Sequence, residues 1–135
     1  MLNEDYKSDK FKETLSQYEQ SVQDGVSCYL DSDQIIAISN YYLDNDKPND
    51  SKRILDMGRK IHPDNCQIRL SYVSALIFIK DYNSALLELE SINSDDIDEL
   101  YLRAQLFLAI DNDLKNADIL FEEWIALLNK ELDEE

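Results

Sequence analysis

Residues 80–90 read KDYNSALLELE, and this stretch decides the fold class. An apolar run over about 66–80 predicts a helix that ends here. Ala85 and Leu89 are four positions apart, so they share one face of a second predicted helix over about 83–92. The stretch therefore predicts two helices that are joined by a very short turn.

The same arrangement recurs on both sides of this stretch. A small residue begins the second helix of each pair at intervals of 34 and 32 residues, and a large apolar residue follows it four positions later. These residues are Ser51, Ala85 and Ala117, followed by Leu55, Leu89 and Phe121. The six predicted helices cover about 31–45, 51–61, 66–80, 83–92, 97–110 and 114–132. A turn over 46–50 separates the first two.

The spacing resembles the tetratricopeptide repeat, a 34-residue unit of two helices. The resemblance covers three copies, at about 32–65, 66–97 and 98–130, and it departs from the family pattern where glycine is usual. Ser39, Val73 and Gln105 occupy that position. The resemblance implies a right-handed α-solenoid of three helix pairs. The opening residues 29–33 and 41–43 are similar to those of tetratricopeptide proteins of Bacteroidetes.

A further helix is predicted before the repeats. Four apolar residues between positions 11 and 22 follow a spacing of 4, 3 and 4, which predicts an amphipathic helix over about 9–23. Gly25 is a plausible stop, because glycine readily adopts the left-handed conformation that ends helices. We therefore expect residues 1–30 to form a helix and a connecting segment. Residues 31–135 should form the repeats and an acidic tail, packed with the first part as one domain.

The composition agrees with an all-α chain and limits its partners. Only two glycines and two prolines occur in 135 residues, too few for the many turns of a sandwich or a barrel. The formal net charge is −16, which disfavours nucleic acids and anionic membranes as partners. We therefore expect a protein or peptide partner, no nucleic acid and no membrane.

Charge is distributed unevenly along the chain. Residues 81–135 carry 16 acids and three bases, whereas residues 1–80 carry 13 acids and ten bases. Five of these bases lie between Lys47 and Lys60. Two interpretations stay open. In the first, the two halves simply present solvated faces of different charge. In the second, the charge attracts another molecule, either a second copy that binds head to tail or a basic partner that binds the C-terminal half.

The sequence offers no recognisable chemistry. His62, the only histidine, is separated from Cys66 by Pro63, and no further metal ligands gather around it. Neither a phosphate-binding glycine loop nor a catalytic triad pattern is present. We therefore expect no enzyme activity, no catalytic residue, no cofactor and no metal. Two cysteines and a charged N-terminus without a signal peptide predict a reducing, cytoplasmic location.

A concave groove is the candidate functional site, because the resemblance places the first helix of each pair along the concave face. The candidate groove residues are Ile36, Asn40, Leu43, Leu70, Ser74, Ile77, Phe78, Leu102, Arg103, Leu106 and Ile110. The pattern agrees, because these helices are apolar on more than one face. The extra apolar face either packs inside the protein or binds a peptide or helix of a partner.

The last predicted helix offers a second candidate surface. Phe121, Trp124 and Leu128 share one face of it, and they are a possible interface of a homodimer. The function predicted first is thus a protein–protein interaction module or scaffold. The alternatives are a homo-oligomerisation module and a chaperone-like holder of a secreted or assembling protein.

Overall fold

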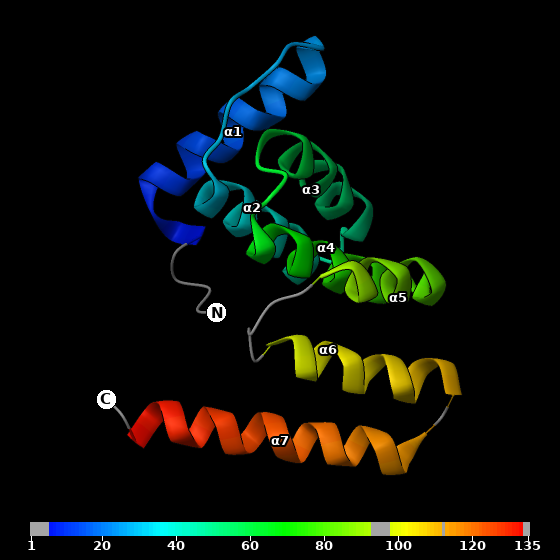
Figure 1. Ribbon diagram of the computed structural model, residues 1–135. Coiled ribbons are helices and arrows are strands. Elements are labelled where there is room, and N and C mark those ends of the chain that lie inside the picture. Colours follow the sequence, from blue (N-terminus) through cyan, green and yellow to red (C-terminus); the bar gives the residue numbers. More distant parts are fainter. Residues whose placement is uncertain (1–5, 93–97, 112, 134–135) are drawn as a thin grey trace. The chain divides into compact units, whose positions relative to one another are not determined.

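Figure 1 shows the protein as a computed structural model, which describes residues 6–92, 98–111 and 113–133. Every secondary-structure element in these residues is helical, which confirms the predicted all-α class. The helices form two compact units, an N-terminal unit over Met1–Asn65 and a C-terminal unit over Cys66–Glu135.

The N-terminal unit contains three helices, α1 (Asp9–Asp24), α2 (Ser32–Asp44) and α3 (Pro48–Ile61). The Ser8 hydroxyl accepts a hydrogen bond from the backbone N–H of Phe11 and caps the start of α1. Gly25 ends α1 with a φ of 68°, as expected from its freedom to adopt the left-handed region.

The start of α2 also agrees with its sequence signal. Asp31 accepts a hydrogen bond from the Gln34 backbone N–H at 2.8 Å, and the Gln34 side chain accepts one from the Asp31 N–H at 3.0 Å. The prediction for α3 was wrong at its start, because α3 begins at Pro48 rather than Ser51. Proline suits the first helical position, where the missing N–H would have no intrahelical partner.

Burial explains how α1 to α3 form one unit. Ile35, Ile38, Ile54 and Leu55 are fully buried on α2 and α3. The hydroxyl of Tyr42 donates a 2.8 Å hydrogen bond to Glu19 and so joins α2 to α1. An aromatic cluster lies between the same helices. Its rings are Tyr6, Phe11 and Tyr41, with centroids 5.2 to 5.6 Å apart.

The C-terminal unit contains α4 (Cys66–Ile79), α5 (Tyr82–Ser91), α6 (Asp98–Leu106), a short π-helix η2 (Phe107–Asp111) and α7 (Leu114–Asp133). Six of the 14 residues of α4 are buried, in agreement with apolar side chains on all sides of this helix. Lys80 follows α4 with a φ of 72°, and Asp81 caps α5. The turn between α4 and α5 is therefore as short as the sequence predicts.

The π-helix η2 was not predicted. The sequence pattern indicates one α-helix over about 97–110, but the α-helical hydrogen bonding ends at Leu106. The backbone N–H of Asp113 then donates to the Phe107 carbonyl at 3.1 Å. Such π turns change which side chains share a face, and many lie at functional sites.

The small residues on which the predicted repeat is based are buried. Ser51, Ala85 and Ala117 are each 0% exposed, which explains why a small side chain recurs at these positions. The predicted boundary between the second and third repeats, near residue 97, lies outside the described residues.

Candidate functional site

The predicted groove residues differ in exposure. Ile36, Asn40 and Leu43 lie on α2 and are half-buried, and so are Ser74, Ile77 and Arg103 in the C-terminal unit. Leu70, Leu102 and Leu106 are buried, whereas Phe78 is 47% and Ile110 is 40% exposed. Only the last two of these hydrophobic residues are therefore largely exposed to solvent.

Three of the predicted residues meet in one pocket of the C-terminal unit, which we call the α5–α6 pocket. Its volume is about 340 Å³. The lining residues are Leu86, Glu90, Arg103, Leu106, Phe107 and Ile110. This volume lies at the lower end of the range for ligand pockets, so the pocket fits one large side chain better than a whole cofactor.

The sequence pattern did not predict that α5 forms one wall of the α5–α6 pocket. Leu86 and Glu90 are four positions apart, so they share a face of α5 that does not contain the buried pair Ala85 and Leu89. The spacing of Leu86 and Glu90 indicates that they share a helical face, but it does not indicate that this face lines a pocket. The other wall includes Phe107 and Ile110 from η2, and their place depends on the π turn that the pattern did not reveal.

The polar groups of the α5–α6 pocket carry opposite charges. The Arg103 guanidinium donates to Glu99 at 2.9 Å, one turn earlier on α6, and this pair fixes the arginine side chain. Glu90 lines the pocket from α5. The pocket therefore combines four apolar residues with one acid and one base, a combination typical of sites that bind an apolar side chain and orient its polar neighbours.

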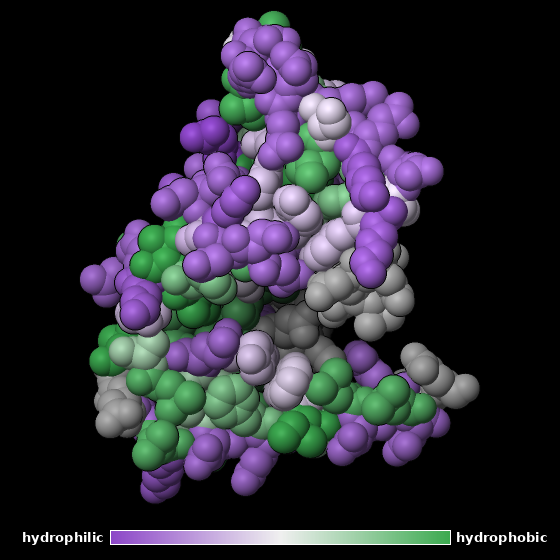
Figure 2. Space-filling view, turned by 180° about the vertical axis from the view of Figure 1, so that it is seen from behind, coloured by the Kyte–Doolittle hydropathy of each residue, from purple (hydrophilic) through white to green (hydrophobic). Residues whose placement is uncertain are grey.

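The candidate end-face residues pack partly against their own unit. The Tyr101 ring on α6 lies 5.7 Å from that of Phe121 and 4.8 Å from that of Trp124, measured between centroids. Phe121, Trp124 and Leu128 are all half-buried. The Trp124 Nε1 atom is buried and has no hydrogen-bond partner among the residues that the structure describes. Figure 2 shows apolar surface along α7, and several of its exposed residues come from outside this set.

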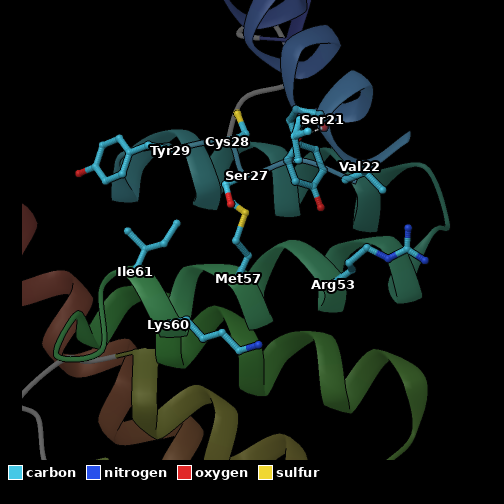
Figure 3. Close-up of a pocket in the computed structure, with 11 residues that line it drawn as sticks. Ser21, Val22, Ser27, Cys28, Tyr29, Arg53, Met57, Lys60 and Ile61 are labelled. Atoms are coloured by element: carbon cyan, nitrogen blue, oxygen red, sulfur yellow. Dashed lines mark hydrogen bonds between the residues drawn. The ribbon is translucent and has the colours of Figure 1, made fainter. Parts of the chain in front are cut away.

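A second pocket, the α1–α3 pocket, lies in the N-terminal unit and was not predicted (Figure 3). Its volume is about 520 Å³. The end of α1, the segment over 26–29 and one face of α3 form its walls. On α3, Arg53, Met57 and Lys60 are spaced 4 and 3, so they share this face. That spacing was a usable signal, since the sequence already showed a gathering of bases here.

Tyr18 contributes to the base of the α1–α3 pocket. It is only 3% exposed, and burial raises the pKa of its phenol above the ordinary value. The nearby Arg53 acts in the opposite direction. The phenol thus stays neutral at physiological pH and adds apolar surface to the pocket.

His62 has a structural environment. Its Nε2 atom lies 3.0 Å from the Leu30 carbonyl oxygen, and its ring packs against Tyr29 at 5.8 Å between centroids. Cys28 and Cys66 are free thiols. Within residues 6–92, 98–111 and 113–133, no group of three or more side chains is arranged to hold a metal ion. Within the same residues, none of the helices is both long and apolar enough to cross a membrane.

Comparison with known proteins gives no family for this chain. No protein-family model matches it, and neither a curated protein nor a solved structure shows significant similarity to it. The tetratricopeptide resemblance therefore stays a prediction from the spacing of residues. The two pockets and the exposed surface of α7 are the features that can bind another molecule.

Proposed function

We propose that this chain is a protein–protein interaction module of tetratricopeptide type. In this proposal, the three helix pairs stack as a right-handed solenoid, and the chain acts in the cytoplasm without catalysing a reaction. The buried small residues Ser51, Ala85 and Ala117 support the repeat, because each lies where the second helix of a pair needs a close approach.

The single observation that supports this function is the α5–α6 pocket, whose lining includes the exposed Ile110. Ile110 is 40% exposed on a π turn, next to a concave surface that contains Leu86 and Phe107. An apolar pocket with a charged group on each wall suits an amphipathic helix or an extended peptide, whose apolar side chain enters while its polar neighbours meet Glu90 and Arg103. Such anchor pockets supply most of the affinity in peptide recognition.

A displayed library of random peptides tests this proposal. The unaltered chain should enrich peptides that share an apolar anchor residue, and Ile110→Asp should reduce their binding at least tenfold. Ile119→Asp is the matched control, because Ile119 is 47% exposed on α7 and does not line the pocket. Both variants should keep their helicity by circular dichroism. Equal binding by the two variants, or no enrichment by the unaltered chain, would contradict the proposal.

A further inference from the structure

The last helix of the C-terminal unit, α7, leaves many of its apolar side chains exposed. Of the 20 residues of α7, only Ala117 is buried. Leu114, Ile125 and Leu132 are 60%, 49% and 65% exposed, and their spacings of 11 and 7 place them on one face of the helix. We call these three residues the α7 stripe. Three exposed apolar residues on one face of a helix form a candidate interface if another surface has matching chemistry.

Acidic side chains border the α7 stripe. The helix carries five acids and two bases. Asp118 and Glu122 follow Leu114 at successive intervals of four, so they lie along one edge of the stripe. Asp133 follows Leu132 directly at its end. A surface that binds this stripe therefore needs apolar walls with cations at its edges.

The α1–α3 pocket has this character. Its apolar part includes Val22, Val26 and Met57, and Arg53 and Lys60 stand one turn on either side of Met57 (Figure 3). Neither cation forms an ion pair within 4.0 Å among the described residues. Two cations beside an apolar pocket are notable in a chain whose net charge is −16, although Glu19 and Asp50 also lie near Arg53.

The dimensions of the two surfaces also agree. Arg53 and Lys60 are seven residues apart on α3, which corresponds to about 10 Å along the axis. Ile125 and Leu132 are separated by the same seven residues on α7, again about 10 Å. The C-terminal half of the stripe can therefore lie along α3 with Ile125 and Leu132 over the pocket. Glu122 and Asp133, the acids that flank this half, then lie toward the two cations.

We propose that the α1–α3 pocket of one molecule binds the α7 stripe of a second copy of this chain. Charge complementarity favours this occupant, because α3 carries four bases and two acids whereas α7 carries two bases and five acids. The proposal does not depend on the proposed function, since neither surface contains a residue of the α5–α6 pocket.

The two surfaces are different, so the contact is head to tail. Each molecule then still has one free pocket and one free stripe, and association continues beyond a dimer unless a ring closes. The mean mass should therefore rise with concentration past twice the chain mass of 15.8 kDa. It should fall when salt is added, because salt screens exposed charges.

Light scattering after size-exclusion chromatography tests the proposal with two double variants. Arg53→Glu/Lys60→Glu disables the pocket, and Ile125→Gln/Leu132→Gln disables the stripe. Each variant alone should be a monomer at every concentration. Mixed in equal amounts, they should form a pair with twice the mass of one chain and nothing larger, because the mixture contains one intact pocket and one intact stripe per pair.

Matched controls separate the contact from general effects of charge or hydropathy. Lys52→Glu/Arg59→Glu makes the same charge change on α3, but both residues pair with Asp56 and neither lines the pocket. Ile119→Gln removes an exposed isoleucine outside the stripe. Both controls should assemble as the unaltered chain does, and circular dichroism should show that all variants keep their helices.

Three outcomes would overturn the proposal. The first is an unaltered chain that stays monomeric at low salt and high concentration. The second is a stripe variant that assembles as well as the unaltered chain, which indicates that the pocket binds another segment. The third is a pocket variant that assembles as well as the unaltered chain, which indicates that α7 binds elsewhere. None of these outcomes bears on peptide binding at Ile110, so the two proposals can fail separately.

Discussion

The two units differ in how completely their helices are satisfied. In the N-terminal unit, α1 and α2 have side-chain caps, and the Tyr42 hydroxyl joins α2 to α1. In the C-terminal unit, α7 is the longest described helix and buries only Ala117. Both units thus keep apolar surface for another molecule: the N-terminal unit has it in a pocket that includes Val22 and Val26, and the C-terminal unit has it along one helix.

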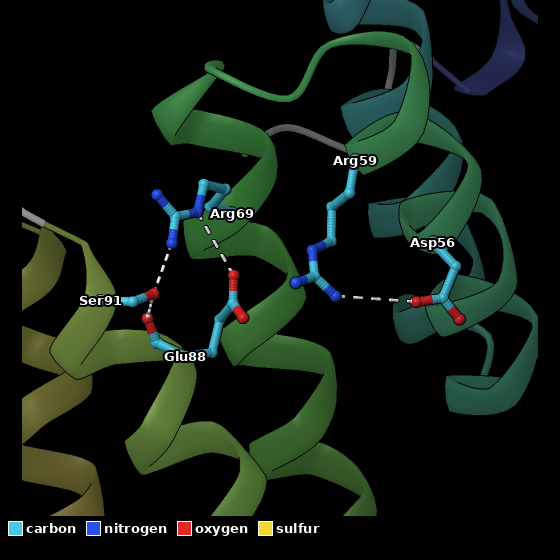
Figure 4. A network of polar contacts seen from close by, with 5 residues as sticks. All are labelled: Asp56, Arg59, Arg69, Glu88 and Ser91. Atoms are coloured by element: carbon cyan, nitrogen blue, oxygen red, sulfur yellow. Dashed lines mark hydrogen bonds and ion pairs between the residues drawn. The ribbon is translucent and has the colours of Figure 1, made fainter.

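The ion pairs of the two units also differ (Figure 4). On α3, Asp56 pairs with Arg59 at 3.9 Å, and this contact stays within one helix. In the C-terminal unit, Arg69 on α4 pairs with Glu88 on α5 at 3.3 Å and also donates to Ser91. Exposed pairs within a helix contribute little, so the pair that joins α4 to α5 matters more for its unit.

The largest expected effect is the difference in stability between two alanine substitutions, one in the core and one in the α7 stripe. Leu55 is fully buried, and Leu55→Ala should lower the free energy of unfolding by about 2–5 kcal/mol, because it removes apolar contacts and leaves a cavity. Ile125 is 49% exposed, and Ile125→Ala should change it by no more than about 0.5 kcal/mol.

Urea denaturation at low protein concentration, where copies do not associate, measures both changes. A loss of more than about 1.5 kcal/mol for Ile125→Ala would show that the stripe is covered inside the molecule, and the contrast between the two units would then disappear.

A smaller effect is expected at Trp124, where the C-terminal unit leaves a polar group unsatisfied. Trp124→Ala removes the ring that packs on Tyr101 and should cost about 2 kcal/mol, because the residue is only half-buried. Trp124→Phe should cost less than about 1 kcal/mol, since the indole N–H has no hydrogen bond to lose within the described part of the chain. Thermal unfolding of the two variants distinguishes packing from hydrogen bonding, and equal losses would indicate a hidden partner of the N–H group.

Local signals made much of the fold predictable. Some helix ends are specified by contacts within a few residues. The structure has the expected ends at Gly25, at the pair Asp31 and Gln34, and at the turn before Ala85. The start of α3 was misplaced because Pro48 serves equally well in a turn and at the first helical position.

The site was only partly predictable. Arg103 and Ile110 were named as groove residues, but the facing wall of Leu86 and Glu90 depends on how α5 packs beside α6. The π turn at Phe107 follows no local residue preference, so the sequence pattern continued the α-helix through it. Burial of Leu106 was likewise a matter of tertiary packing, which a periodic apolar pattern indicates without saying which face is covered.

The smallest expected effect concerns the link between α1 and α2 and its pH dependence. Tyr42→Phe removes the hydrogen bond to Glu19 and should cost about 1 kcal/mol at neutral pH. Burial, together with this bond, raises the pKa of the Tyr42 phenol above its ordinary value of 10. Below pH 10 the phenol is protonated in both the folded and the unfolded chain, so its contribution to stability is complete there.

Above pH 10 the unfolded chain releases the phenolic proton and the folded chain retains it, so stability should fall as pH rises. Urea titrations at several alkaline pH values should show a shallower fall for Tyr42→Phe than for the unaltered chain. Tyr41→Phe, a change at the neighbouring tyrosine, is the control for the loss of a hydroxyl on α2. Identical slopes for all three proteins would mean that the bond between α2 and α1 does not hold the N-terminal unit together, and that its caps and buried isoleucines stabilise it without this link.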